Sequence, residues 1–319
     1  MTIRSLKSVF EKIKDVDKWD LQVLRISSES SSTKYASRRI VLEPADELAN
    51  TVRENATKYL DKDKEYLSKY VEVLDYDGTT DATRIYKLDS KNQLIAGQYT
   101  AFTDAIADPD VEADPTRFTS ASVIIGSIPV NGEQCSVKLI SIQKPFTHLK
   151  QKFLISSKFK IGGDITGGTY KKLDEDVLNL QNKWDVVIVR DEVYFFTMNG
   201  EKLFDMERSY RAVCNSTIEE IEHSGLISDS SMEVFKSAAN RGHNPRRFVA
   251  FNRARFEALK DKEKRKQMAD TFKIKLDDSG KFDANIEGAV DAIVKLLCNK
   301  GMVDPFENEA VEVFGAKPW

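Results

Sequence analysis

Apolar residues recur at regular spacings near the start of the chain, and these spacings predict both helices and strands. Leu6, Phe10 and Ile13 stand three or four residues apart, which is the spacing of one helix face. Residues 20–27 alternate apolar and polar side chains, as a strand with one buried face does. A second strand at residues 38–43 is predicted to return beside the first.

The neighbouring segments are more polar. Residues 27–37 are rich in serine and predict a loop between the two strands. Pro44 stands where a helix can begin, and the heavily charged residues 45–70 predict a long surface helix.

An Asn-Gly pair marks the clearest turn. Asn131 and Gly132 accept the positive φ of a tight hairpin, and β-rich runs at residues 119–130 and 133–143 flank them. Further strands are predicted at residues 71–76, 84–88 and 152–161, and residues 185–196 predict a strand pair that reverses near Asp191 and Glu192.

Helical spacing dominates the second part of the chain. It recurs at residues 202–214, 216–225, 230–239 and 253–272, and the chain ends with a predicted strand (273–277), a turn at Ser279-Gly280, a helix (286–300) and an edge strand (310–315). The predicted fold class is α+β, with a mixed or antiparallel sheet. The predicted lobes are residues 1–198, strand-rich, and residues 199–319, helix-rich; one continuous domain is the alternative.

Composition limits the classes of function. The 319 residues are 41% hydrophobic, which is enough for a substantial core. The 48 basic and 51 acidic residues leave a net charge of −3, which excludes a protein that binds nucleic acid over its whole surface. A nucleic-acid site must therefore be a local patch.

The cysteines and the apolar runs predict a cytoplasmic protein. Cys135, Cys214 and Cys298 form no CxxC pair and lie at no zinc spacing. The N-terminus lacks the apolar core of a signal peptide, and no stretch approaches the roughly 20 apolar residues that span a bilayer. Recruitment to the inner membrane would require a partner.

Residues 101–116 carry five acids and no base. We interpret this segment as an acidic loop that connects two elements. A metal site or a DNA-mimicking patch is the alternative.

Motifs for catalysis or nucleotide binding are not recognisable in the sequence. The glycines of residues 162–168 lack the Gly-Lys-Ser/Thr that a phosphate loop needs, although Lys171 and Lys172 could contact a phosphate backbone. His148, His223 and His243 belong to no metal or triad pattern. We predict no catalytic residue, no metal and no cofactor.

A metal-dependent nuclease is the main enzymatic alternative, because carboxylates could hold magnesium beside a phosphate. The strand pair around Asp185, Asp191 and Glu192 lacks a following acid-x-lysine strand, and Glu201-Lys202 is predicted to lie in a turn. We therefore favour a non-enzymatic function.

The charge is unevenly distributed. Residues 236–266 hold eleven bases and three acids, a net charge of +8 in a chain whose total is −3. Such segregation predicts an electropositive face, and phosphate backbones are its commonest target. The segment around Pro245 is too rich in Gly, Asn and Pro for a helix and is predicted to be a loop that presents arginines, while Asn252 is predicted to cap the next helix.

The predicted DNA contacts follow from this charge argument. They are Arg241, Arg246, Arg247, Arg253, Arg255, Lys260, Lys264, Arg265 and Lys266, with Lys171 and Lys172 in addition. The simpler interpretation is a solvated, highly charged helix face. Helix-turn-helix and zinc-finger signatures are missing from the sequence, so non-specific binding to double-stranded DNA is favoured over sequence reading.

The chain also resembles a known family. Residues 185–229, followed by RRFVAFNRARF, KIKLDDSGKFD and residues 293–315, are similar to the KwaB-like family, the B subunits of the bacterial Kiwa antiphage defence system. The resemblance runs through most of the chain and rests on apolar and aromatic positions.

This resemblance implies a DNA-binding effector that acts with a KwaA-like membrane protein to hinder phage DNA replication or expression. It also implies self-association, as a homodimer or a larger oligomer. We expect the apolar strands at residues 122–130 and 186–196 to lie at sheet edges or lobe surfaces and to assist assembly by the strand-rich lobe. A scaffold that binds the membrane partner but not DNA is a third hypothesis.

Overall fold

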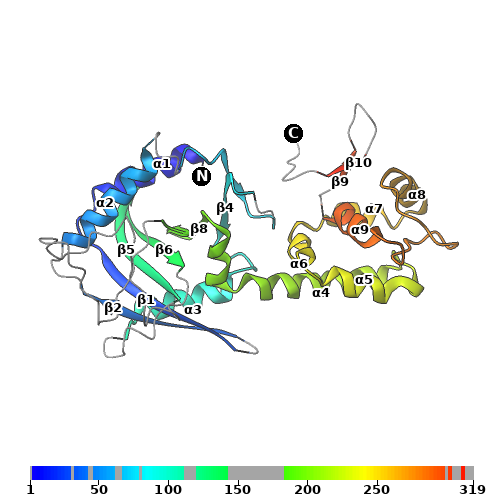
Figure 1. The fold of residues 1–319 in the computed structure, drawn as a ribbon, viewed down its shortest axis with the longest axis horizontal. Helices are drawn as coiled ribbons and strands as arrows, with labels where there is room; N and C mark the ends of the chain where they lie inside the picture. The colour runs from blue at the N-terminus through cyan, green and yellow to red at the C-terminus, as the bar shows by residue number, and fades with distance from the viewer. Residues whose placement is uncertain are drawn as a thin grey trace, which may run out of the picture. The chain divides into compact units, whose positions relative to one another are not determined.

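Two compact units make up the computed structural model (Figure 1). Unit 1 comprises Met1–Val71 and Gln98–Gly200, and unit 2 comprises Glu72–Gly97 and Glu201–Trp319. The structure describes residues 2–29, 32–41, 46–61, 67–78, 81–110, 120–142, 183–298, 301–303 and 310–312.

An antiparallel sheet forms the centre of unit 1. Its strands follow the order β2-β1-β5-β6-β7-β8. They are β1 (Asp20–Ser28), β2 (Thr33–Ile40), β5 (Ala121–Val130), β6 (Glu133–Ile142), β7 (Val186–Val189) and β8 (Glu192–Phe195). The expectation that the apolar strands lie at sheet edges is wrong for β5 and β7. β5 lies between β1 and β6, and β7 lies between β6 and β8, so their apolar side chains serve the core.

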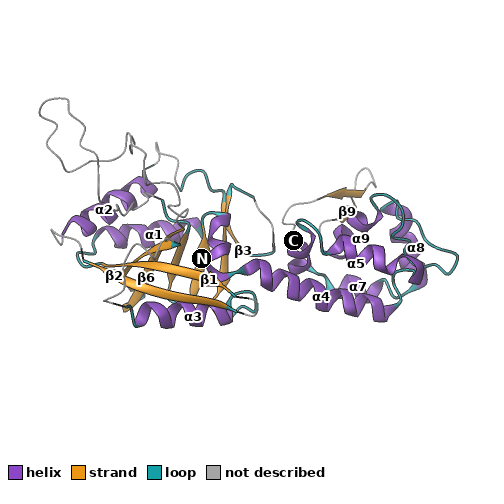
Figure 2. Ribbon diagram, turned by 60° about the horizontal axis from the view of Figure 1, so that its bottom comes forward, coloured by secondary structure: helices purple, strands orange, loops and turns teal. Residues whose placement is uncertain are grey.

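Helices cover both faces of this sheet. α1 (Ile3–Lys14) and α2 (Asp46–Leu60) pack against each other on one face, and α3 (Ala96–Ala107) lies on the other (Figure 2). Leu6, Phe10 and Ile13 are buried on α1, as their spacing predicts.

An aromatic cluster fills the core beneath α1 and α2. The rings of Tyr59 and Trp184 stack with centroids 4.9 Å apart, and Phe10 stacks on Tyr59 at the same distance. The Trp184 backbone N–H also donates to the Tyr59 hydroxyl at 2.8 Å. This cluster joins the N-terminal helices to the start of β7.

Unit 2 is helix-rich and has its own core. Its elements are the parallel pair β3 (Glu72–Asp75) and β4 (Arg84–Asp89), the helices α4 (Met206–Ser224), α5 (Met232–Ala239), α6 (Asn244–Arg247), α7 (Arg253–Ala258), α8 (Lys262–Thr271) and α9 (Ala289–Leu297), and the hairpin β9 (Gly301–Val303) and β10 (Ala310–Glu312). Buried apolar residues of α4, α5, α7 and α9 form one cluster. The predicted α+β class, with strands first and helices second, is confirmed.

Three polar segments differ from the prediction. The serine-rich residues 27–37 are largely strand, because Lys34 and Tyr35 pair with Ser27 and Ile26 across the β1–β2 hairpin. The acidic residues 101–107 complete α3, with Phe102 and Ile106 buried one turn apart. The helix predicted at 45–70 ends at Leu60, and residues 67–69 form a turn.

The helices of unit 2 also differ in their boundaries. The segments predicted at 202–214 and 216–225 are one helix, α4, because no Gly or Pro separates them. The segment at 253–272 is two helices, since Asp261 caps a new one by accepting from the Lys264 backbone N–H at 3.0 Å. The four residues from Asn244 form α6 and not the predicted loop, because a proline is favourable in a first helical turn.

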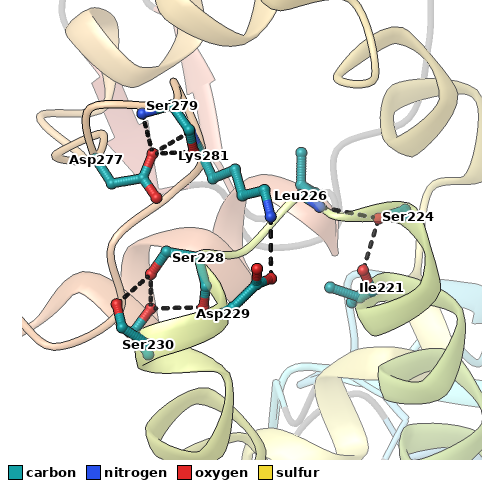
Figure 3. A network of polar contacts seen from close by, with 10 residues as sticks. Ile221, Ser224, Leu226, Ser228, Asp229, Ser230, Asp277, Ser279 and Lys281 are labelled. Atoms are coloured by element: carbon teal, nitrogen blue, oxygen red, sulfur yellow. Dashed lines mark hydrogen bonds and ion pairs between the residues drawn. The ribbon is translucent and has the colours of Figure 1, made fainter.

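The turn predicted at Ser279-Gly280 is confirmed. Gly280 has φ +78°, and the Asp277 carboxylate accepts from the backbone N–H groups of Ser279 and Lys281, each at 2.9 Å (Figure 3). The Lys281 ammonium donates to Asp229 at 2.9 Å. The strand predicted at 273–277 is reduced to a single bridge between Leu276 and Phe282. The strand predicted at 152–161 lies outside the described residues.

Candidate nucleic-acid interface

The basic segment, residues 236–266, runs from α5 through α6 and α7 into α8, all in unit 2. Asn252 caps α7, as predicted, by accepting from the Arg255 backbone N–H at 2.9 Å. Because the segment is divided into short helices, the basic side chains of successive helices point in different directions. Their environments therefore have to be considered one by one.

Arg246 lies in the interior of unit 2. It forms an ion pair with Glu201, and each of the two side chains is only 15% exposed. Its Nε donates to the Tyr76 hydroxyl at 3.0 Å, and the same hydroxyl donates to Glu201 at 2.5 Å. Its guanidinium also lies 5.5 Å from the centre of the Tyr210 ring. The predicted loop that presents arginines is therefore the short helix α6, and its first arginine, Arg246, is largely enclosed.

Tyr76 and Tyr210 complete this polar cluster. Their hydroxyls are 2.5 Å apart, and burial raises the pKa of both phenols, so both stay protonated. Gly78 approaches the backbone of Arg246 so closely that a Cβ there would lie 2.4 Å from the carbonyl oxygen. The segment after β3 is therefore fastened to α6 by side-chain hydrogen bonds and by close backbone packing.

Arg247, Arg253 and Lys260 are each paired with an acid. Arg247 Nη1 lies 2.5 Å from the Asp291 carboxylate. Arg253 binds both carboxylate oxygens of Glu220, at 2.7 and 2.9 Å, and this hydrogen bonding lowers the pKa of Glu220. Lys260 lies 2.6 Å from Glu257. Asp291 and Glu220 lie outside the segment and offset two of its eight net positive charges, whereas Glu257 is already counted in that net charge.

Arg255 has a role at the end of a helix. Its Nη1 donates to the Leu296 carbonyl at 2.6 Å, near the C-terminus of α9, where the helix itself supplies no donor. Burial lowers the pKa of this guanidinium. Arg255 therefore joins α7 to α9 and is poorly placed to reach a phosphate.

The bases of α8 have a different environment. Lys262, Lys264 and Lys266 are exposed, and in the described part of the chain no carboxylate pairs with them. Arg265 is only 6% exposed. Arg241, just after α5, is exposed and likewise lacks an acidic partner among the described residues.

The structure thus divides the predicted site. Lys264, Arg265 and Lys266 lie together on α8, whereas Arg246 and Arg255 are enclosed. Lys262 contributes to the charge of the segment but is not among the predicted contacts. Its position in the first turn of α8 follows from the N-cap at Asp261. Lys171 and Lys172 lie outside the described residues.

Other candidate chemistry is sparse. Among the described residues, no three His, Cys, Asp or Glu side chains gather as a metal site would require. Two of the three strand-pair residues considered for a nuclease have structural partners, since Asp185 accepts from the Ile142 backbone N–H at 2.8 Å and Glu192 accepts from the Tyr194 hydroxyl. His223 and His243 are exposed, and His148 lies outside the described residues.

A comparison with protein families gives one match. The model of the family described as Kiwa protein KwaB-like matches residues 144–307, which is half of the chain. The chain belongs to the KwaB-like family. It is therefore a component of a Kiwa antiphage defence system. Comparison with curated proteins and with solved structures found no match.

The family match includes the whole basic segment and begins about 40 residues before residue 185, where the quoted resemblance starts. α8 is therefore part of the KwaB-like region of the chain and not an appendage to it. In the parts of the chain with described structure, no helix has the length and apolar character of a membrane span.

Proposed function

We propose that this KwaB-like protein is a non-enzymatic effector that binds double-stranded DNA through α8. The observation that carries the proposal is the contrast within the basic segment. Arg247, Arg253 and Lys260 are neutralised by acids, whereas Lys262, Lys264 and Lys266 have no acid partner in the described structure. Unpaired, exposed cations displace condensed counterions from DNA most readily.

Binding of this kind is expected to be non-specific. Phosphate contacts carry no base information. α8 also carries Glu263 and Asp270 on its exposed surface, and these carboxylates would be repelled by the phosphates if the helix entered a groove deeply. The helix would lie along the backbone. Binding along the phage genome would hinder the polymerases that replicate or transcribe it.

Family membership supports two further proposals about assembly. We propose that the protein acts with a KwaA-like membrane protein, which would bring it from the cytoplasm to the inner membrane. We also propose that it self-associates, and that unit 1 supplies the assembly surface. Because β5 and β7 are interior strands, we place that surface on the helices of unit 1 or at its edge strand β2.

Charge reversal on α8 tests the DNA proposal. A variant with Lys262, Lys264 and Lys266 changed to glutamate should bind short duplex DNA at least tenfold more weakly at moderate salt. Its plot of log affinity against log salt should be flatter by up to about 3, one phosphate for each lysine. Fluorescence anisotropy over a series of salt concentrations measures both.

The matched control carries the same change in net charge elsewhere. Lys18, Lys91 and Lys202 are also exposed, so their change to glutamate alters the overall charge equally without touching α8. This control should keep the parent's salt slope. Equal losses in the two triple variants would mean that only net charge matters, and the α8 site would be wrong.

A further inference from the structure

Arg265 is the one base of α8 that points inward. Its residue is 6% exposed, and its Nε is enclosed without a hydrogen-bond partner. Within the described structure, no carboxylate, carbonyl or hydroxyl accepts from its side chain.

This arrangement is unfavourable for folding alone. Enclosing a hydrogen-bond donor without a partner costs about 1–3 kcal/mol in general, and enclosed donors in proteins are therefore usually bonded. The other enclosed arginines of unit 2 follow that rule, because Arg246 has Glu201 and Arg255 has the Leu296 carbonyl. Arg208 likewise pairs with Asp205, whereas in the described structure no acid pairs with Arg265, and an unsatisfied buried donor calls for a partner.

The helix itself supplies no such partner. One turn before Arg265, the Asp261 carboxylate is used to cap α8, and one turn after it stands Ala269. Lys262 stands three residues before Arg265, on the neighbouring part of the helix surface. An enclosed cation beside an exposed lysine is a local arrangement that favours an anion.

We propose that Arg265 anchors a site for a phosphate group, with Lys262 at its rim. The planar guanidinium donates two parallel hydrogen bonds to a phosphate, which a lysine cannot do. The proposal rests on the proposed function in one respect, namely that the phosphate belongs to the DNA backbone. A free phosphate offers the same chemistry, and the experiment separates the two sources.

An anchor of this kind has a distinctive signature. Arg265→Met keeps the length of the aliphatic side chain and removes the charge, so it should melt at the same temperature as the parent or higher. DNA affinity should nevertheless fall roughly tenfold to a hundredfold, as expected for the loss of charge-assisted hydrogen bonds. The DNA affinity of Arg265→Lys should be intermediate, because lysine keeps the charge but cannot donate two parallel hydrogen bonds.

The experiment combines two titrations of the full chain. Duplex DNA binding is measured by anisotropy for the parent, Arg265→Met and the control Arg211→Met, which removes an exposed arginine that Glu207 already neutralises. Thermal melting of the same proteins is followed against millimolar inorganic phosphate, with chloride at matched ionic strength. We expect phosphate to raise the melting temperature of the parent and of Arg211→Met more than that of Arg265→Met.

Each result has a definite meaning. Loss of DNA affinity confined to Arg265→Met supports a backbone phosphate at the site. Phosphate protection that depends on Arg265, with DNA binding unchanged or missing in the parent, supports a free phosphate, and a parent that binds no DNA separately refutes the proposed function. If neither titration depends on Arg265, the proposal is wrong. If both Arg265→Met and a second uncharged variant, Arg265→Gln, melt several degrees below the parent, Arg265 is a structural residue and the proposal also fails.

Discussion

Replacing Arg246 with alanine should destabilise unit 2 by about 3 kcal/mol, which is the lower end of the cost of removing one partner from a buried ion pair. The lower end applies because Arg246 and Glu201 are each 15% exposed and because the Tyr76 hydroxyl still donates to Glu201 after the change. The stranded carboxylate is therefore only partly satisfied, and the cavity left under Tyr210 adds to the loss.

Urea denaturation followed by circular dichroism at 222 nm measures this change, since most of the helical residues belong to unit 2. Arg253→Ala is the matched control: its pair with Glu220 has a 69% exposed arginine and should contribute about 0–1 kcal/mol. Tyr76→Phe removes one hydroxyl from the same cluster and should lie between the two. The double variant of Arg246 and Glu201 should lose less than the sum of the single losses, because the residues share one interaction.

Equal stability of the Arg246 and Arg253 variants would refute this reasoning. If it holds, loss of DNA binding in any variant of Arg246 has to be read as loss of folding. The arginine would then have to be removed from the set of predicted DNA contacts, although its charge belongs to the basic segment.

Three other predictions follow from the structure and the proposed function. Asp277 has a pKa below its usual value because the backbone N–H of Lys281 and the hydroxyl of Ser279 donate to it, so its contribution to stability should be present at neutral pH and be lost as the pH falls through that lowered pKa; the acid limb of a stability-against-pH curve should flatten in Asp277→Asn, and an unchanged limb would contradict the assignment. Purified protein should leave plasmid and linear DNA intact with magnesium or manganese, and cutting that disappears when a single acidic residue is replaced would establish the nuclease alternative. Light scattering at micromolar concentration should show a dimer or larger species, whereas a monomer alone would refute self-association.

Elements with regular apolar spacing could be predicted from the sequence, because that spacing reflects burial directly. α1, the β5–β6 hairpin and the β7–β8 pair are examples, and their turns agree as well, with Asn131 at φ +53° and Arg190 at φ +55°. The helical ends were harder. The division between α7 and α8 depends on one capping aspartate, Asp261, within a run of charged residues whose helical propensity is uniformly high.

The candidate site could be predicted only in part. The charge count locates the basic segment, but it cannot show that Arg246 meets Glu201, 45 residues earlier, or that Arg247 meets Asp291, 44 residues later. Nor can it show that Arg265 points inward while its neighbours point outward. Those facts depend on how the helices pack, and sequence spacing alone carries no information on partners so far apart.

The stack of Trp184 on Tyr59 gives the protein a built-in optical reporter. The chain has three tryptophans, and those in the described residues, Trp19 and Trp184, both belong to unit 1. With Trp319 changed to phenylalanine, tryptophan fluorescence would report on unit 1 alone, while far-ultraviolet ellipticity would come from the helices of both units, the larger share from unit 2. Two signals from one cuvette could then show whether the halves of this defence protein unfold together or in succession, and which of them responds when DNA is added.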